Sequence, residues 1–277
     1  MNVKQFLNPF FLGRSILTLL VLPIVLLSLG LSTASAKEYD FFYFNPDSSQ
    51  GNMGHLKREM DEFLSHSPLK ISFQPFVHLV DLERKLDEKK PAFVFVPNWY
   101  LAGRGSQLGM KPLLLPARQG KQSYSKVLLV GKDSGIDLNR IENRSMAMTS
   151  MGIDVQPFLD TILFSRHGVQ TENLNIVMVP KDSDALFALV LGQVDAALVT
   201  MENLEQLEAL NPRLVSGVKK IAETDPISLP VLGYVEGGAS VEDLRKFVDY
   251  FMQENNDAKK KPIMEMLKID AWHKSVQ

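Results

Sequence analysis

The feature that most constrains the fold is an alternation of short apolar runs with stretches of helical period. Residues 39–44 form a continuous aromatic and apolar run, which is typical of a buried strand. Apolar residues then recur at three- and four-residue spacing over 53–64, which predicts an amphipathic helix. The period changes to two over 69–73, a charged helix follows over 80–87, and 92–96 is wholly apolar, as in a covered parallel strand. The first half therefore predicts the order β-α-β-α-β.

The second half repeats this architecture without visible sequence identity to the first. Its expected elements are strands over 124–130, 145–148, 174–179 and 195–199 and helices over 154–167 and 184–191. Strands that alternate with helices imply α/β lobes with mostly parallel sheets and right-handed crossovers. We therefore expect a two-lobed α/β protein, each lobe a sheet flanked by helices.

The chain is expected to cross between the lobes twice and so to form a two-strand hinge. Strands over 218–222 and 229–235 would carry it back to the first lobe, and helices over 241–253 and 259–267 follow. The expected first lobe comprises residues 37–125 and 224–277, and the second comprises residues 126–223.

The first 36 residues differ in kind from the rest. They carry only Lys4 and Arg14 as charges before an apolar run over 16–31. The run ends in an A-x-A pattern at Ala34 and Ala36, which predicts a signal peptide cleaved after Ala36 and a periplasmic protein. A retained anchor is the alternative, because about 16 apolar residues approach the roughly 17 to 25 that span a bilayer.

Composition excludes several classes of partner and site. The chain has no cysteine, so it has no disulfide, no thiolate nucleophile and no lipid-modified cysteine. Without Lys4 and Arg14 it carries 28 basic and 32 acidic residues, a formal charge of −4. This weak acidic balance argues against nucleic acid. The one short basic run, at 259–261, is interpreted as a solvated helix face.

No motif for catalysis, metal binding or a cofactor is visible. The five histidines are scattered without metal-ligand spacing, and the chain contains no G-x-S-x-G elbow, P-loop or H-E-x-x-H. We therefore expect a protein that is not an enzyme, with no metal and no cofactor, although residues distant in sequence could still converge.

Candidate ligand-binding residues lie where the expected strands end, because ligands of open α/β sheets bind beyond the carboxyl ends of the strands. Asn45 and Asn98 each follow a strand of the first lobe. Thr149, Ser150 and Gly152 follow a strand of the second lobe and precede a helix, so they could hold an anion with hydroxyl and amide donors. An ordinary helix cap is the alternative for this group.

Three further side chains are candidates with equally plain structural alternatives. Tyr100 follows a strand and could form an aromatic wall against a ligand, or it could be buried between helices. Tyr124 begins the expected crossing strand and could act in the same way. Asp195 could contact a ligand or could cap the turn before its strand.

Three segments carry a resemblance to a known family. They are Ser123–Val130, Lys132–Ile136 and the helix-then-strand segment Ala185–Val199. The chain resembles the periplasmic solute-binding proteins of phosphate, phosphite and phosphonate ABC importers over nearly all of 37–277. The resemblance implies the type 2 periplasmic-binding-protein fold, in which two lobes close around a small solute by hinge bending, and a monomer.

One motif departs from the family pattern. The family's Ser-Thr-Ser-Gly phosphonate site reads Thr149-Ser150-Met151-Gly152 here, so a thioether stands where the third hydroxyl is expected. Methionine cannot donate that hydrogen bond, which removes a charge-assisted contact worth about 1.5 to 3 kcal/mol. The resemblance therefore favours another oxyanion or a less charged solute over phosphonate.

We expect an extracytoplasmic solute-binding protein that captures a small anionic, phosphate- or phosphonate-like solute. Thr149, Ser150 and helix amides would hold the anionic group, and Tyr100 or Tyr124 would close over it. Its partner would be the membrane permease of an ABC importer. The alternative is a periplasmic ligand-sensing protein that acts on a membrane signalling partner, and neighbouring genes would separate the two.

Overall fold

The computed structural model describes residues 37–47, 53–151, 155–164, 167–169, 171–253 and 257–275. Contacts divide the chain into Met1–Lys37 and Glu38–Gln277, and the fold described below is that of the second unit. The expected signal peptide over 1–36 lies outside the described residues. None of the helices in the described ranges is both long enough and apolar enough to cross a bilayer.

The first lobe is built on a six-stranded sheet with the order β13-β4-β12-β3-β1-β2. Its strands are β1 (Glu38–Phe44), β2 (Lys70–Phe76), β3 (Phe93–Val96), β4 (Met110–Ala117), β12 (Val231–Val235) and β13 (Ala271–Lys274). β1 pairs in parallel with β2 and β3, whereas β12 is antiparallel to β3 and β4, and β13 is antiparallel to β4. The sheet is therefore parallel on its β3-β1-β2 side and antiparallel on the other, whereas the sequence predicted a mostly parallel sheet.

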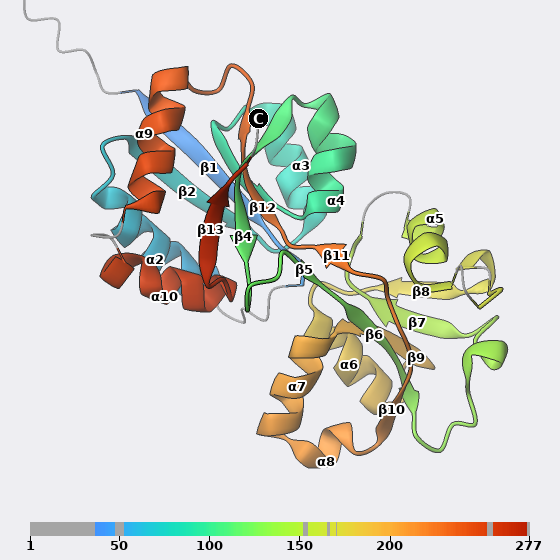
Figure 1. Ribbon diagram of the computed structural model, residues 1–277. Helices are drawn as coiled ribbons and strands as arrows, with labels where there is room; N and C mark the ends of the chain where they lie inside the picture. The colour runs from blue at the N-terminus through green and yellow to red at the C-terminus, as the bar shows by residue number, and fades with distance from the viewer. Residues whose placement is uncertain are drawn as a thin grey trace, which may run out of the picture. The chain divides into compact units, whose positions relative to one another are not determined.

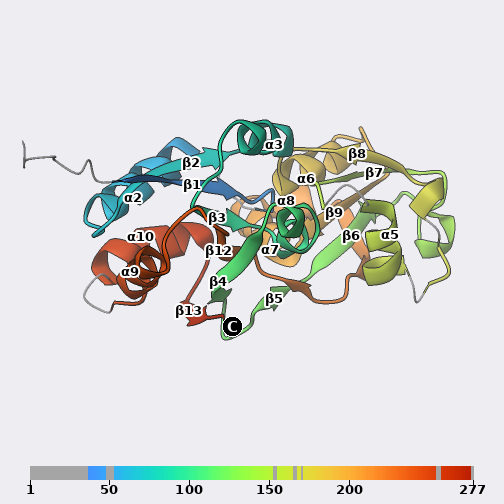
Figure 2. The same ribbon diagram turned by 90° about the horizontal axis from the view of Figure 1, so that it is seen from above.

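Helices cover both faces of this sheet (Figures 1 and 2). One face packs against α2 (Met53–Ser65), α9 (Val241–Met252) and α10 (Asp257–Leu267). The other packs against α3 (Leu79–Glu88), the short α4 (Asn98–Tyr100) and the π-helical turn η1 (Leu101–Gly105). Because successive residues of β1 point to opposite faces, Phe41 and Phe42 belong to the two different cores.

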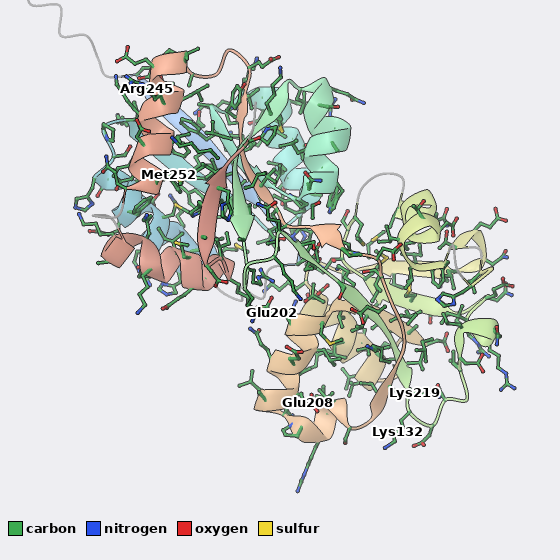
Figure 3. The ribbon with its side chains drawn as sticks, in the orientation of Figure 1. Lys132, Glu202, Glu208, Lys219, Arg245 and Met252 are labelled. Atoms are coloured by element: carbon green, nitrogen blue, oxygen red, sulfur yellow. The ribbon has the colours of Figure 1, made fainter. Side chains whose placement is uncertain are left out.

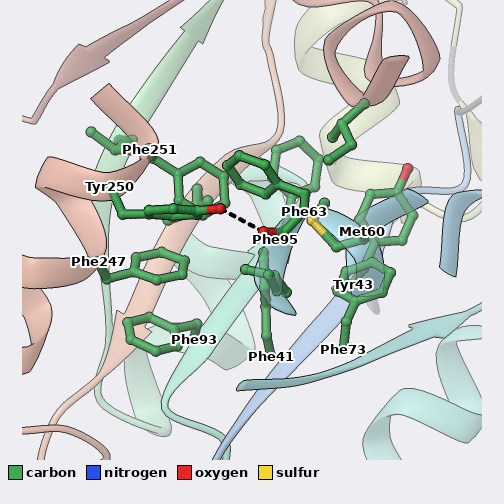
Figure 4. Packing of buried hydrophobic residues seen from close by; sticks show 14 of the residues in the cluster. Phe41, Tyr43, Met60, Phe63, Phe73, Phe93, Phe95, Phe247, Tyr250 and Phe251 are labelled. Atoms are coloured by element: carbon green, nitrogen blue, oxygen red, sulfur yellow. Dashed lines mark hydrogen bonds between the residues drawn. The ribbon is translucent and has the colours of Figure 1, made fainter. Parts of the chain in front are cut away.

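Aromatic side chains dominate the larger of these cores (Figure 4). Phe93 of β3 stacks on Phe247 of α9 with ring centroids 3.8 Å apart. The Tyr250 hydroxyl, on the same helix, donates to the carbonyl oxygen of Phe63 in α2. Large rings in close contact bury much apolar surface, so this core fixes the helices of the first lobe to its sheet.

The second lobe has a five-stranded sheet with the order β10-β6-β9-β7-β8. Its strands are β6 (Lys126–Gly131), β7 (Ser145–Met148), β8 (Asn175–Met178), β9 (Ala196–Thr200) and β10 (Val218–Glu223). β7 is parallel to β8 and β9, and β6 is antiparallel to β9 and β10. This sheet is also mixed, with its parallel strands next to one another.

Helices flank the second sheet as well. One face packs against α6 (Asp182–Val190) and α7 (Met201–Leu210), with α8 (Pro212–Val215) following α7. The other packs against α5 (Val155–Leu159) and the π-helical turn η3 (Asp160–Phe164). Two short 3-10 turns, η2 (Leu138–Arg140) and η4 (Thr171–Asn173), lie in the connections.

Two short strands connect the lobes, β5 (Ser123–Tyr124) and β11 (Ile227–Ser228). They pair antiparallel, with Tyr124 opposite Ile227, and form a separate two-stranded sheet between the larger ones (Figure 1). The strand predicted over 124–130 is therefore two elements, β5 in the connection and β6 in the second sheet. The lobe boundaries at 125/126 and 223/224 remain our proposal.

In the basic run at 259–261, Lys259 and Lys261 are exposed, as predicted for a solvated helix face, but Lys260 is not. Lys260 is buried, and its ammonium group donates to the carbonyl oxygens of Phe251 and Gln253 at 3.0 Å each. These carbonyls lie in the last residues of α9 and just after it, where helix carbonyls lack partners within the helix. Lys260 therefore fastens α10 to α9.

Candidate ligand-binding site

The carboxyl ends of the parallel strands carry most of the buried polar side chains that meet between the two sheets. Asp47 follows β1 in the first lobe, and Thr149 follows β7 in the second. Asp182 begins α6 after β8, and Thr200 ends β9 and caps α7. The strand order of the second sheet places β7 between β8 and β9, so these side chains lie close together.

Lys126, the first residue of β6, is the centre of this group. Its side chain is fully buried. Its ammonium Nζ lies 2.7 Å from Asp47 Oδ1, 2.8 Å from Thr149 Oγ1 and 3.0 Å from Asp182 Oδ1. An ammonium group has three N–H donors, so these three oxygens satisfy it completely. We call Asp47, Tyr124, Lys126, Thr149 and Asp182 the Lys126 cluster.

Asp47 joins the first lobe to this cluster through both carboxylate oxygens. Oδ1 accepts from Lys126 and, at 2.7 Å, from the hydroxyl of Thr149. Oδ2 accepts from the hydroxyl of Tyr124 in β5. Burial of that hydroxyl and the neighbouring Asp47 charge hold the pKa of Tyr124 well above its usual value, so Tyr124 stays a neutral donor.

Asp182 is the second carboxylate next to Lys126 and is held entirely within the second lobe. Its Oδ2 accepts from the backbone N–H of Thr200 at 2.6 Å and from the side-chain amide of Asn203 at 3.1 Å. Burial raises the pKa of Asp182, although the Lys126 charge acts against that rise. Burial opposes the charge on Lys126, but Asp182 and Asp47 outweigh it and its pKa is raised. Lys126 is therefore a permanent cation.

A second charged group lies beside the Lys126 cluster. Glu202, in the first turn of α7 (Figure 3), forms ion pairs with Arg118 and, at 2.9 Å, with Lys268. Burial lowers the pKa of Lys268, and Glu202 acts against that shift. These residues, with Asp47 and others, line a cavity of about 20 Å³, which has room for about one water molecule.

A larger cavity is lined by Ser150, the residue that follows Thr149 in the sequence. It has a volume of about 180 Å³. Its polar lining comes from Ser150 and His78, and its apolar walls come from both lobes: Phe44, Pro46, Val77, Leu79, Met178, Val179 and Pro180. Since a water molecule takes up about 30 Å³ of the liquid, this space suits a solute of only a few heavy atoms.

The structure brings together four of the predicted site residues. Thr149 and Tyr124 belong to the Lys126 cluster, Asn45 lines the 20 Å³ cavity, and Ser150 lines the 180 Å³ cavity. Thr149 and Ser150 thus face different surroundings, since the hydroxyl of Thr149 is already bonded to Asp47. Gly152 lies outside the described residues.

Two other predicted residues of the first lobe lie apart from the Lys126 cluster and both cavities. Tyr100 is buried, and its hydroxyl donates to Glu83 of α3 at 2.7 Å, which corresponds to the alternative interpretation, burial between helices. Asn98 begins the short helix α4.

Asp195 is also placed away from the cluster. It precedes β9, and its Oδ2 accepts from the backbone N–H and the hydroxyl of Ser145, the first residue of β7. The bonds to Ser145 lower the pKa of Asp195. Both residues lie at the amino ends of their strands, at the opposite edge of the sheet from Thr149. The prediction that Asp195 binds ligand is therefore replaced by its alternative, a cap that joins the two strands.

The sequence did not single out four residues that form this site: Asp47, Lys126, Asp182 and Asn203. Asp47 and Asn203 do lie in strand-end turns of the kind expected to bind a ligand. Lys126 carried a usable signal, because it is a lysine directly before the apolar run over 127–130. Asp182 carried a weaker one, since it begins a helix directly after a strand.

The sequence matches one family model over residues 41–276, described as the periplasmic substrate-binding protein of phosphonate ABC transporters. No curated protein sequence matches the chain.

Several solved structures share the fold at low sequence identity. A binding protein component of an ABC phosphonate transporter from Pseudomonas aeruginosa is 17% identical, with a TM-score of 0.69 over 87% of this chain and 82% of that one. A protein from Prochlorococcus marinus, solved with methylphosphonate, is 12% identical, with a TM-score of 0.70 over 87% and 93%. The periplasmic aliphatic sulphonate binding protein from Escherichia coli is 12% identical, with a TM-score of 0.53 over 84% and 78%.

These matches confirm the predicted family and the predicted two-lobed α/β fold, the type 2 periplasmic-binding-protein fold. The family match covers far more than half of the chain. This protein therefore belongs to the family of periplasmic substrate-binding proteins of phosphonate ABC transporters.

Proposed function

We propose that this protein captures a small anionic solute in the periplasm and delivers it to the membrane permease of an ABC importer. The observation that supports this most strongly is the meeting of buried polar groups from both lobes at the carboxyl ends of the strands, beside a cavity of about 180 Å³. Ligands of open α/β sheets bind at this edge. The family match supports the importer and gives no support to the sensor alternative.

The solute would bind in the 180 Å³ cavity, with its polar group toward Ser150 and its apolar part against Phe44 and Val179. Few polar groups in an apolar cavity fix the orientation of a ligand, and the apolar walls exclude water around it. The solute would be small, because the space is small. Tyr124 and Asn45 would act indirectly, through Asp47, which contacts both of them.

Our proposal also includes properties of the chain as a whole. Capture and delivery break no covalent bond, so we propose a protein without catalytic activity, metal or cofactor and without affinity for nucleic acid. We also propose that the leader is cleaved after Ala36 and that the protein diffuses as a monomer between solute and permease.

The test is thermal unfolding of the protein purified from the periplasm, with a panel of phosphate, phosphite, methylphosphonate, sulfate, alkylsulfonates and short carboxylic acids. A ligand that binds only the native state adds about 2.7 kcal/mol at one hundred times its dissociation constant. We expect one class of small anion to raise the melting temperature by several degrees. Unchanged melting temperatures across the whole panel would contradict an anionic solute.

A site variant shows where the solute binds. Ser150→Ala removes the cavity's hydroxyl and should weaken binding of the active solute about tenfold, the value of a hydrogen bond to a charged group. Ser134→Ala is the matched control, because that serine lies in an exposed turn after β6 and donates to Gly131. Equal affinities of all three proteins would place the solute elsewhere.

A further inference from the structure

The donors around Asp47 form a complete binding site for a single carboxylate. They are the ammonium of Lys126 at 2.7 Å, the hydroxyl of Thr149 at 2.7 Å and the hydroxyl of Tyr124. Charged and hydroxyl donors of this kind are also what an oxyanion needs in a protein. The side chains of Lys126 and Thr149 are fully buried, so these donors are held in a fixed, water-poor place.

Asp47 lies in a different part of the fold from the residues that donate to it. It comes from the turn after β1, whereas Thr149 follows β7 and Lys126 begins β6 in the second sheet. Its carboxylate is 9% exposed. Among the described residues of its own turn, it contacts Asn45, whose Oδ1 accepts from the backbone N–H of Asp47 at 3.2 Å. The carboxylate at this site therefore comes from the first lobe, whereas its hydrogen-bond donors lie in the second lobe and in the connection between the lobes.

Asp182, unlike Asp47, is held by residues of its own lobe. It is anchored by the N–H of Thr200 and the amide of Asn203, both in the same lobe. It therefore serves as the fixed counterion of Lys126. The site formed by Lys126, Thr149 and Tyr124 still needs one further anionic ligand, and Asp47 supplies it.

We propose that Asp47 is an internal competitor for the anion site of this protein: its carboxylate occupies the place of an external oxyanion, and an oxyanion binds Lys126, Thr149 and Tyr124 only when Asp47 is displaced or removed. This inference goes beyond the proposed function, since the anion site of the Lys126 cluster is distinct from the 180 Å³ cavity lined by Ser150. Asp47 would act as a specificity-determining residue that disfavours strongly charged oxyanions.

The charges explain why an oxyanion cannot simply be added. Asp47 and Asp182 are two anions against the single cation Lys126, so the cluster already has a formal charge of −1. A doubly charged phosphonate next to both carboxylates would meet like charges at a few ångströms in a buried place, where repulsion is strong. Removal of the Asp47 carboxylate leaves Lys126 and Asp182 balanced and frees one N–H of Lys126 and the hydroxyl of Tyr124, whereas the hydroxyl of Thr149 still has Asp182 Oδ1 at 3.3 Å.

The test compares Asp47→Ala with the parent protein by calorimetric titration of acetate and of inorganic phosphate. The truncation leaves a space of carboxylate size between Lys126 and Tyr124. We expect the variant to bind at least one of the two anions about tenfold or more tightly than the parent, in line with one hydrogen bond to a charged group. The same anion should raise the melting temperature of the variant and leave that of the parent nearly unchanged.

Three further variants make the result specific. Glu83→Ala removes another carboxylate of the first lobe that also accepts from a buried tyrosine, Tyr100, and it should gain no affinity for either anion. The double variant Asp47→Ala/Lys126→Met should lose the gained affinity, because the cation of the site is gone. Asp47→Asn keeps the shape of the side chain and removes its charge, so it should show a smaller gain in the same direction.

The outcomes separate this inference from the proposed function. If Asp47→Ala gains no more affinity for acetate or phosphate than Glu83→Ala, Asp47 is a structural residue and the inference is wrong, even if the parent binds a solute in the panel. If Asp47→Ala is recovered folded only in buffers that contain acetate or phosphate, the anion replaces the lost carboxylate and the inference holds. A gain that survives in the double variant with Lys126→Met would also overturn it, since the anion would then bind elsewhere.

Discussion

Lys126 is the residue on which the meeting of the two lobes depends most. It is fully buried and is bonded to Asp47, Asp182 and Thr149. Lys126→Met would leave two carboxylates near each other without a cation. Removal of one partner from a buried charge pair costs about 3 to 5 kcal/mol, so we expect a loss of that size in the free energy of unfolding, measured by urea denaturation.

The pH dependence of that loss provides a second check. Asp182 already has a raised pKa because of burial, and loss of Lys126 would raise it further. A carboxyl group with a folded pKa above its unfolded value binds protons more readily in the folded state, so stability rises as the pH falls through the folded pKa. The deficit of Lys126→Met should therefore shrink between pH 8 and pH 5. The exposed Lys132→Met is the control and should change stability by less than about 0.5 kcal/mol. A pH-independent loss of the same size for both variants would contradict this role.

At the residue scale, the sequence predicted where the site lies better than it predicted which residues form it. Thr149 was predicted because it follows a strand, where ligands of this fold class bind, and Tyr124 because it begins the expected crossing strand. Lys126 and Asp47 were not, because their bond joins residues 79 positions apart and depends on how the lobes meet. For Asp195 the sequence left ligand contact and a turn cap open, and its bonds to Ser145 correspond to the cap.

At the scale of elements, the close approach of β12 to β4 depends on a glycine. Gly233 lies at a register shift between the two strands, opposite Pro112. A Cβ atom at Gly233 would lie 2.7 Å from the carbonyl oxygen of Lys111 and 3.3 Å from Val94. We expect Gly233→Ala to destabilise the protein by about 1 to 3 kcal/mol, the usual cost of overpacking a core, as measured by urea denaturation.

Gly103→Ala is the matched control for that substitution. No atom lies within 4 Å of the Cβ that it would add, and alanine restricts the unfolded chain. The control should be neutral or slightly stabilising. Equal stability of Gly233→Ala and Gly103→Ala would mean that β4 and β12 separate easily, contrary to the packing described here.

The strands that the sequence did not predict are those without the usual sequence signs of a strand. β4 contains Pro112 and Pro116, and proline is normally a sign against a strand within a sheet. β13 is only four residues long, too short for an alternating pattern to be recognised. Both lie on the antiparallel side of the first sheet. The predicted parallel sheets were therefore correct for the β-α-β units and incomplete beyond them.

At the scale of the whole molecule, two kinds of connection join the lobes. The hinge strands β5 and β11 are a covalent connection with a short hydrogen-bonded ladder. The bonds of Asp47 to Lys126, Thr149 and Tyr124 are polar contacts that can break. A solute that separates the lobes must compete with these contacts.

The most direct test of this account is a calorimetric titration of the purified protein with the small anion that stabilises it most, repeated with Ser150→Leu. The leucine side chain would fill the 180 Å³ cavity without touching the charges of the Lys126 cluster. The account predicts saturable binding of one solute per chain to the parent and a loss of at least tenfold in affinity in the variant. No saturable binding by the parent, or the same affinity in Ser150→Leu, would contradict solute capture at this site.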